Sequence, residues 1–492
     1  MSKARFFAVA LAAVAVTALA TDSSAQQDAG LELQECRISA GPGSPTRAAR
    51  CGKLLRPLNP ADPESGEIAL AVAVVPALSL EPAPDPLIVI AGGPGQSSIQ
   101  YYVSVAGAFE RIRRERDIVL LDQRGTGASA PLNCPADAGL LEGGADLDLV
   151  VEQAAACAQT LDHDPRYFTT SIAVGDFAAL ASALGYPRVN VYGVSYGTRV
   201  AQHLLRRYPA LVRSTILDGV VPPTIPLGPD IALAAQRSLD HAFSRCQRET
   251  ACNERFPELR SDFDELRARL QEQPRIVDVI DAASGQPRAV EIGGDELAGA
   301  IRLLSYHPST VALLPLLIDS AARGNYEPLA SQLLLATQSL ADSLSIGMHN
   351  SVICSEDVPY YATTDFDEAA LEATYIGPMQ VSLLRAICSV WPAGPVDDDF
   401  HEPLQLSNPV LLLSGEADPV TPPRFADVAA ETLPNALHLV ARDQGHGLAI
   451  RGCTPRIMAD FVEAADISAV DSSCLERVFA MPFFIDFSGP SP

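Results

Sequence analysis

The chain has 492 residues and a formal net charge of −25, with 48% hydrophobic and 19% charged residues. A protein this acidic is a poor partner for nucleic acid and for anionic membrane surfaces. The apolar content is enough for a large core, and no low-complexity linker divides the chain, although its length exceeds that of one ordinary domain.

The first 25 residues have the pattern of an export signal. Lys3 and Arg5 give a positive start, Phe6–Ala20 is an apolar run, and Ser23-Ser24-Ala25 is a small-residue cleavage site. The run is short for a membrane span, and no later segment has about 18 uninterrupted apolar residues. We expect a signal peptide over 1–25 and export to the periplasm or the medium without stable membrane insertion. An uncleaved amino-terminal anchor is the alternative.

Ten cysteines in an exported chain favour disulfides over metal ligands. No C-x-x-C pair and no H-E-x-x-H motif indicates zinc, so we expect no metal site. Buried free thiols are the alternative, which an oxidising compartment disfavours. Pairing by neighbour along the chain predicts the disulfides Cys36–Cys51, Cys134–Cys157, Cys246–Cys252, Cys354–Cys388 and Cys453–Cys474.

From residue 68 onward, short apolar runs bounded by turn residues alternate with helical stretches. This pattern is typical of a mostly parallel sheet that helices cover on both faces. Up to residue 217 the predicted strands are Ile68–Val75, Leu87–Ala91, Asp117–Leu121, Val189–Tyr192 and Ser214–Leu217. The predicted helices are Ser171–Leu184 and Thr198–Tyr208.

The pentapeptide Gly193-Val194-Ser195-Tyr196-Gly197 joins the strand Val189–Tyr192 to the helix Thr198–Tyr208. A G-x-S-x-G sequence at a strand-to-helix junction is typical of the nucleophile elbow of α/β-hydrolases. The turn holds its serine at strained backbone angles, and small flanking residues avoid clashes there. We therefore predict an α/β-hydrolase with Ser195 as the nucleophile. A glycine-containing loop without chemical function is the alternative.

After Pro222-Pro223 the pattern becomes mainly helical and stays so to about residue 404. Its clearest elements are the amphipathic helices Ala232–Arg245 and Phe256–Leu270 and a hairpin of Arg275–Ile280 with Arg288–Ile292. The last predicted elements are the strands Pro409–Leu413 and Leu437–Val440 and the helix Ile457–Ala465.

This order of elements predicts a hydrolase core in two parts, 26–223 and 405–492. The segment 224–404 is predicted to be a large, mainly helical cap inserted after the sixth strand. An insertion at that point lies over the carboxyl ends of the strands, where open α/β sheets bind ligands.

A serine nucleophile needs a base, and the base needs a carboxylate that orients it. In this fold the order along the chain is serine, acid, histidine. Asp418 follows the strand Pro409–Leu413 and His446 follows the strand Leu437–Val440, so both belong at the sheet edge that carries Ser195. We therefore predict a triad of these three residues.

Each of these assignments has an alternative. Asp418 precedes a proline and could begin a turn, and His446 lies between glycines and could belong to an exposed loop. Glu416 and Asp218 are the rival acids, the latter at the end of the strand Ser214–Leu217. Three residues in the right order at the right strand ends favour the triad.

Charge that develops on a substrate carbonyl oxygen needs donors that are already in place. The backbone N–H of Tyr196, next to the nucleophile, is one such donor. The loop after the strand Leu87–Ala91 should supply the other, and Gly93 is our choice, with Gly92 as its rival. A glycine-rich turn without a ligand is the alternative. Arg124 is expected to order these loops rather than to take part in chemistry.

Four segments form a joint signature, namely Gly92-Gly93-Pro94-Gly95-Gln96-Ser97, Asp122-Gln123-Arg124-Gly125-Thr126-Gly127, Gly193-Val194-Ser195-Tyr196-Gly197-Thr198 and Asp418-Pro419-Val420-Thr421-Pro422. Together they resemble secreted bacterial exopeptidases of the tripeptidyl aminopeptidase and proline iminopeptidase type. The stretch that holds Gly445-His446-Gly447, Cys453 and Cys474 is similar to the tail of the tripeptidyl aminopeptidase branch. The resemblance covers nearly the whole mature chain and implies the same triad.

The elbow departs from one branch of that family. Proline iminopeptidases typically carry G-G-S-W-G-S there, whereas this chain carries Gly193-Val194-Ser195-Tyr196-Gly197-Thr198. The difference favours the tripeptidyl or a broader aminopeptidase branch. Some proteins similar to this group cleave esters, so the resemblance implies a fold and a triad more firmly than a substrate.

An aminopeptidase must recognise a free substrate ammonium, for which a partly desolvated carboxylate is the physical solution. In related exopeptidases acidic cap residues have this role, and Glu356 is our choice over Asp357 here. A disulfide at Cys354 would hold that segment rigid. An acidic helix start or an exposed loop is the alternative. Trp391 could line the pocket, although core packing is the better explanation.

The expected function is that of an exported serine hydrolase acting on peptides with a free amino terminus, with no metal or organic cofactor. A cap over the site would admit short chains and exclude folded proteins, which favours an exopeptidase. An esterase or amidase with the same triad is the main alternative. A non-catalytic binding module is the second, and a missing triad member would favour it.

Overall fold

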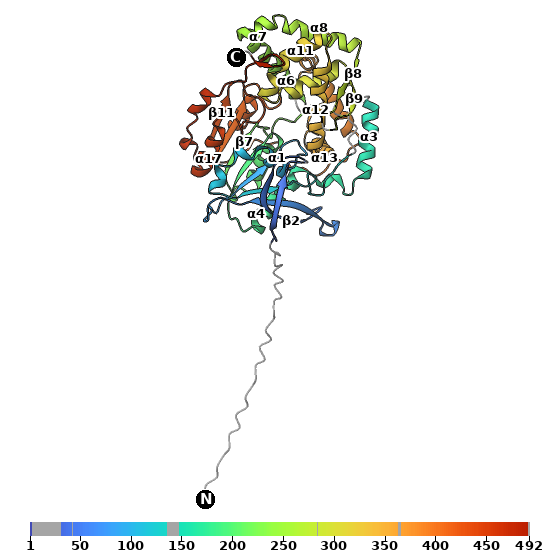
Figure 1. Cartoon of the computed structure of the whole chain (residues 1–492). Coiled ribbons are helices and arrows are strands. Elements are labelled where there is room, and N and C mark those ends of the chain that lie inside the picture. The colour runs from blue at the N-terminus through green and yellow to red at the C-terminus, as the bar shows by residue number, and fades with distance from the viewer. Residues whose placement is uncertain (2–30, 42, 135–146, 283, 363–365, 491–492) are drawn as a thin grey trace. The chain divides into compact units, whose positions relative to one another are not determined.

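A nine-stranded sheet in the order β1-β2-β3-β5-β4-β6-β7-β10-β11 forms the centre of the computed structural model (Figure 1). Strands β5, β4, β6, β7, β10 and β11 run parallel to one another, whereas β1, β2 and β3 pair antiparallel, β3 with β5 at the junction. The bounds are β1 Gln34–Ser39, β2 Thr46–Pro57, β3 Glu67–Val75, β4 Leu87–Ile90, β5 Ile118–Leu121, β6 Val189–Val194, β7 Val212–Asp218, β10 Val410–Gly415 and β11 Ala436–Ala441.

The structure describes residues 1, 31–41, 43–134, 147–282, 284–362 and 366–490. The predicted signal peptide lies outside the described residues apart from Met1. A compact unit begins at Leu31. None of the described helices is both long enough and apolar enough to cross a membrane.

All seven predicted core strands are present, which confirms this part of the sequence interpretation. Strands β4, β5, β6 and β10 are buried along their whole length, as expected for parallel strands covered on both faces. Strands β1 and β2 were not predicted. Their side chains are mostly polar and at least partly exposed, so they lack the apolar run that marked the others.

Helices cover both faces of the sheet, as predicted. Alternate residues of each strand point to opposite faces, so Ile88 and Ile90 join one buried cluster and Leu87 and Val89 join another. The first cluster packs against α4 Thr170–Ala183, α5 Tyr196–Arg207 and α16 Pro423–Ala430. The second packs against α1 Ser98–Val105 and α17 Thr454–Ala464.

A mainly helical segment lies between β7 and β10. It follows the seventh strand in chain order, not the predicted sixth. The sequence marked five strands before it, and β1 and β2 add two. Its elements are α6 Pro229–Arg248, α7 Thr250–Arg255, α8 Leu259–Glu272, β8 Arg275–Ile280, β9 Pro287–Ile292, α9 Gly294–Leu304, α10 Pro308–Val311, α11 Leu314–Ala322, α12 Glu327–Ser343, α13 Ile346–Glu356, α14 Glu368–Glu372 and α15 Met379–Cys388. The antiparallel pairing of β8 with β9 confirms the predicted hairpin.

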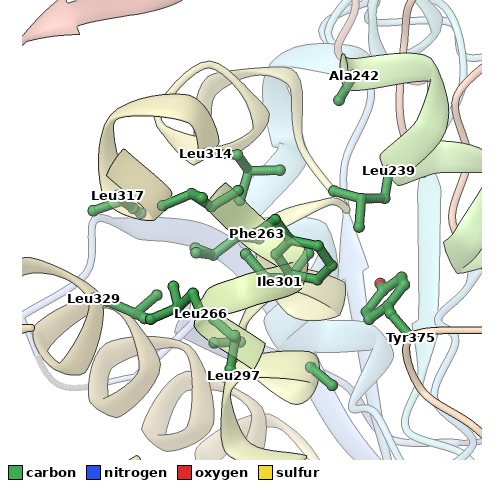
Figure 2. Close-up of a cluster of buried hydrophobic side chains, with 14 of the residues drawn as sticks. Leu239, Ala242, Phe263, Leu266, Leu297, Ile301, Leu314, Leu317, Leu329 and Tyr375 are labelled. Atoms are coloured by element: carbon green, nitrogen blue, oxygen red, sulfur yellow. The ribbon is translucent and has the colours of Figure 1, made fainter. Parts of the chain in front are cut away.

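Most of this inserted segment has an apolar core of its own. Figure 2 shows Phe263, Leu266, Ile301 and Leu314, from α8, α9 and α11, meeting in that core. Figure 1 shows α6, α8 and α11 grouped together and apart from β2. Helix α13 is different, because its residue Met348 packs into the buried cluster on the sheet that holds Ile88 and Ile90. The insertion is therefore tied to the sheet through α13.

All ten cysteines are paired in the structure, as the order along the chain predicted. The bonds are Cys36–Cys51, Cys134–Cys157, Cys246–Cys252, Cys354–Cys388 and Cys453–Cys474. The second of these joins Cys134 to α3 Leu147–Thr160, and the fourth joins α13 to α15. Trp391 packs in a small cluster with α3, and its indole N–H donates to Ser351 Oγ at 3.2 Å. Trp391 is thus a packing residue.

Arg124, in the loop after β5, forms a fully buried ion pair with Asp176 of α4. Its Nε and Nη2 lie 2.7 and 2.9 Å from the two carboxylate oxygens. The guanidinium also donates to the carbonyls of Leu58 and Tyr167. These contacts hold the loop in place, which matches the structural role expected for Arg124.

We predict that Asp176→Ala lowers the free energy of unfolding by about 3–5 kcal/mol, because it leaves the buried Arg124 charge uncompensated. The matched control is Asp240→Ala, which removes one partner of the exposed Arg260–Asp240 pair and should cost less than about 1 kcal/mol. Denaturant unfolding with the disulfides intact measures both values. Equal losses in the two variants would contradict the prediction.

Candidate active site

Ser195 lies at the sharp turn between β6 and α5, where the sequence placed the nucleophile elbow. Its backbone has φ 55° and ψ −127°, a conformation that is strained for any residue with a side chain. A β-carbon at Gly193 would collide with the carbonyl of Gly197, and one at Gly197 would collide with the carbonyl of Ala91. Both glycines are therefore required for this turn to pack against β4.

The Ser195 side chain is partly exposed, and its hydroxyl has no hydrogen-bond partner among the described residues. Its backbone N–H donates to the carbonyl of Asp218 at the end of β7, at 2.9 Å. The elbow is thus fixed through the backbone while the hydroxyl stays free to react.

Asp418 and His446 are in direct contact, and the Asp418 Oδ2 to His446 Nδ1 distance is 2.8 Å. Asp418 also accepts hydrogen bonds from the backbone N–H groups of Val420 and Thr421, both at 2.8 Å, and from the Thr421 hydroxyl. These bonds fix the carboxylate. With Nδ1 facing Asp418, the imidazole presents Nε2 as the nitrogen that can act as a base.

The electrostatics of this pair suit a base. Burial alone would lower the pKa of His446, but the charge and hydrogen bond of Asp418, with a smaller effect from Asp218, raise it above 6.5. Asp418 therefore stabilises the imidazolium that would form when His446 takes a proton.

Ser195 and His446 lie against the same dipeptide, Asp218-Gly219. The Ser195 N–H bonds the Asp218 carbonyl, and a β-carbon on Gly219 would lie 3.0 Å from His446 Cε1, the ring atom next to Nε2. The two side chains thus share one edge of the sheet. No hydrogen bond joins them in this structure, and such bonds commonly tighten only when substrate binds.

The two rival acids have other partners. Asp218 is fully buried, and its carboxylate accepts from the Tyr192 hydroxyl and from the backbone N–H groups of Leu448 and Ala449. Glu416 is exposed and accepts from the backbone N–H of Asp443. Of the three candidate carboxylates, Asp418 is the one that contacts the imidazole.

The loop after β4 lies against the nucleophile. A β-carbon on Gly92 would be only 2.9 Å from Ser195 Cβ. Gly93 follows with φ 104°, and neither its N–H nor that of Tyr196 donates to a protein acceptor in the described part of the chain. Both N–H groups are thus available for a substrate oxygen. Asp122 holds this loop, because its carboxylate accepts from Ser97 Oγ at 2.6 Å.

The side chain of Tyr196 points away from the site and anchors the elbow. Its hydroxyl lies 2.5 Å from Thr170 Oγ1 and accepts from Gln123 Nε2 at 3.0 Å. Burial and the nearby Glu356 raise its pKa far above its ordinary value, so it stays neutral. Only the backbone of Tyr196 can serve the reaction.

Glu356, the predicted ammonium anchor, lies in the protein interior. Its side chain has no exposed surface, and its two oxygens accept from the backbone N–H and the hydroxyl of Thr170 at 2.6 and 2.9 Å. Burial raises the pKa of Glu356 to about 8, so the group holds its proton at neutral pH. A buried neutral carboxyl is poorly suited to bind an ammonium ion. Glu356 is the last residue of α13 and fully buried, so it is also neither the helix start nor the exposed loop of the alternative.

The rival residue Asp357 is also engaged. Its Oδ1 lies 2.6 Å from Arg199 Nη1 of the elbow helix and accepts from the Leu227 N–H at 2.7 Å. Both side chains of this ion pair are buried. The segment after Cys354 therefore ties α13 to the helix that follows the nucleophile.

The sequence interpretation missed Tyr306, which follows α9 of the insertion. Its carbonyl accepts from the His446 N–H at 2.8 Å, and its ring meets the imidazole edge-on with 5.3 Å between centroids. On the other side of the site, the Ser345 N–H donates to the Gly95 carbonyl at 3.0 Å. No local motif marks these residues, because only the folded insertion brings them to the site.

One group of described residues could place ligand atoms around a metal ion. Atoms of His241, Glu416 and Asp443 lie within 4.8 Å of one another. His241 Nε2 is already 2.6 Å from Asp443 Oδ1, and Glu416 accepts the Asp443 N–H. Hydrogen bonds account for this arrangement, which links α6 to the loops that carry Asp418 and His446.

We predict that Glu356→Gln changes the pH dependence of stability. The unfolded carboxyl loses its proton near pH 4.5 and the folded one near pH 8. The contribution of protonated Glu356 to stability is therefore fully present below pH 4.5. As pH rises from 4.5 to about 8, the free energy of unfolding falls by up to about 1.4 kcal/mol per pH unit. The glutamine variant lacks this loss.

Thermal unfolding between pH 5 and 8 measures the effect, with the exposed Glu431→Gln as the control. The melting temperature of Glu356→Gln should rise relative to that of the wild type as pH increases. Parallel curves for the wild type and Glu356→Gln would show that the carboxyl is ionised in the folded protein.

Comparisons with known proteins agree with this fold. A family model described as the alpha/beta hydrolase fold matches residues 85–269, and one described as TAP-like protein matches residues 373–474. The putative hydrolase YuaR of Escherichia coli K12 is 24% identical over 470 residues, which cover 86% of this chain and 88% of that protein.

Two groups of curated relatives are named as peptidases. Tripeptidyl aminopeptidase of Streptomyces coelicolor is 23% identical, over 92% of this chain and 87% of that protein. Serine protease Hip1 of Mycobacterium tuberculosis is 27% identical over 241 residues, 45% of this chain and 46% of that protein. Among solved structures, proline iminopeptidase of Mycobacterium smegmatis is 17% identical with a TM-score of 0.40, covering 85% of this chain and 99% of that one.

The nine-stranded sheet, the nucleophile turn and both family matches point the same way. The chain has the α/β-hydrolase fold, is a hydrolase, and carries a TAP-like carboxyl-terminal region.

Proposed function

We propose that this hydrolase is an exported serine peptidase that releases short fragments or single residues from the amino terminus of peptides. One observation carries the proposal: Ser195, at a strained turn, shares a sheet edge with the hydrogen-bonded pair of His446 and Asp418. The relatives named tripeptidyl aminopeptidase support a peptidase, and the five disulfides support export.

In the proposed reaction Ser195 Oγ attacks the substrate carbonyl carbon while His446 Nε2 takes the hydroxyl proton. The N–H groups of Tyr196 and Gly93 bind the oxyanion. The imidazolium, held by Asp418, then gives its proton to the leaving amine, and an acyl-enzyme remains. Water activated by His446 attacks the acyl carbon and releases the acid.

The insertion supports a preference for short chains. It contacts the site from two sides, through Tyr306 at His446 and through Ser345 at Gly95. A covered site of this kind admits a chain end more readily than the middle of a folded protein, which favours an exopeptidase.

An esterase or amidase is the second candidate, and the interior position of Glu356 favours it. An aminopeptidase needs a group that recognises the substrate ammonium, and Glu356 is buried and bonded to Thr170. An enzyme that acts on acyl esters has no such requirement.

We predict that a fluorophosphonate probe labels the wild-type protein and does not label Ser195→Ala. The exposed Ser104→Ala is the matched control and should label normally. Labelling that persists in Ser195→Ala would remove Ser195 from the reaction.

A panel of mono-, di- and tripeptide anilides, each free or acetylated at the amino terminus, then separates the two candidates. An aminopeptidase loses turnover on acetylation. Equal turnover of free and acetylated substrates, or turnover of acyl esters alone, would identify an esterase or amidase.

A further inference from the structure

Arg302, in the last turn of α9, lies one side chain away from the proposed catalytic base. Its Nη2 donates to the Tyr306 hydroxyl at 3.3 Å, and its guanidinium lies 6.0 Å from the centre of the Tyr306 ring. That ring meets His446 edge-on. The insertion therefore places a positive charge beside the reacting groups.

The charge of Arg302 also affects a second histidine, His349 of α13. His349 Nδ1 lies 3.4 Å from the carbonyl of Pro94, in the loop that carries Gly93. Burial lowers the pKa of His349, and Arg302 lowers it further. At His446, burial and, to a smaller extent, the charge of Arg302 lower the pKa, and both oppose the rise that Asp418 causes. The charge of Arg302 thus disfavours the protonated form of both histidines.

Arg302 has no acidic partner within the described ranges of the chain. The buried arginines Arg124 and Arg199 each pair with an aspartate, whereas Arg302 forms no ion pair. Its Nε is buried and without a hydrogen-bond acceptor.

A second unpartnered group lies in the apolar core of the insertion. The Tyr375 hydroxyl is buried without a hydrogen-bond partner, and burial raises its pKa while the charge of Arg302 opposes the rise. Figure 2 shows the Tyr375 ring in the apolar core, near Ile301. A guanidinium offers only donors, and tyrosine hydroxyls can donate as well. A carboxylate accepts hydrogen bonds and carries negative charge, so it would complement the Arg302 guanidinium and the Tyr306 hydroxyl that it contacts.

We propose that Arg302, with the hydroxyl of Tyr306, binds a carboxylate of the substrate. This inference rests on the proposed function, and it narrows the substrate class to peptides with a carboxylate close to the scissile bond. A planar guanidinium can bind a carboxylate through two parallel hydrogen bonds, which also fixes its orientation. The carboxylate can belong to an aspartate or glutamate side chain or to the carboxyl terminus of a short peptide.

Two pairs of peptides distinguish these sources. The first pair places Glu or Gln at each position of a tripeptide anilide, and the second ends the same short peptide in a free acid or an amide. We expect the wild type to prefer one acidic member by about 10- to 100-fold in kcat/KM, mainly through KM. The pair that shows the preference identifies the source.

The preference should disappear in Arg302→Met and persist in part in Arg302→Lys, which keeps the charge but not the planar fork. Arg302→Glu should reverse it in favour of a Lys-containing substrate. The matched control is Arg260→Met, which removes an arginine that lies over Phe243 in the same insertion, and it should keep the wild-type preference. Circular dichroism verifies that each variant is folded.

Binding to Ser195→Ala, measured by calorimetry with the same acid and amide peptides, tests the site without hydrolysis. Acid peptides should bind more tightly to Ser195→Ala than to the double variant with Arg302→Met, and amide peptides should not. An acid-to-amide ratio that is the same in both proteins would overturn the inference. Ser195-dependent turnover of the neutral peptides tests the proposed function separately.

Discussion

Asp218 connects the two loops on which the proposed chemistry depends. Its carbonyl accepts the N–H of Ser195, and its carboxylate accepts the N–H groups of Leu448 and Ala449, just after His446. A buried carboxylate is costly unless hydrogen bonds satisfy it, and burial does raise the pKa of Asp218. The bonds that satisfy the carboxylate fix the loop of the base, and the bond to the backbone carbonyl fixes the nucleophile at the same sheet edge. Asp218, which the sequence offered as a rival to Asp418, thus links the nucleophile turn to the loop of the base.

The insertion is coupled to the same edge at two points. Tyr306 bonds the His446 backbone and Ser345 bonds the Gly95 backbone, so a movement of the insertion would reach both the base and the oxyanion loop. The buried pair of Arg199 and Asp357 adds a tie from α13 to the elbow helix. Substrate selection and the alignment of reacting groups therefore depend on one set of contacts.

The sequence was informative where chemistry needs a local pattern. The turn at Ser195 tolerates little but glycine on either side, and buried parallel strands require apolar runs, so the elbow, the seven core strands and the five disulfides were all predictable. The contact of Asp418 with His446 was also anticipated, from their places after two strands.

Other features depend on contacts between distant segments and leave no local signal. Strands β1 and β2 are polar and partly exposed, so nothing marked them. Tyr306 and Arg302 reach the site only because the insertion folds over it. Glu356 was misjudged because its neighbour Thr170, 186 residues away, completes its hydrogen bonds in the interior.

The central claim is that Ser195, His446 and the two N–H groups converge on one reacting carbon. A crystal structure of the protein treated with a peptidyl phosphonate tests it most directly. The account predicts a phosphorus bonded to Ser195 Oγ, its oxygen about 2.7–3.1 Å from the N–H nitrogens of Tyr196 and Gly93, and His446 Nε2 within hydrogen-bond distance of Ser195 Oγ. An adduct on another residue, or an imidazole turned away from Ser195, would contradict it.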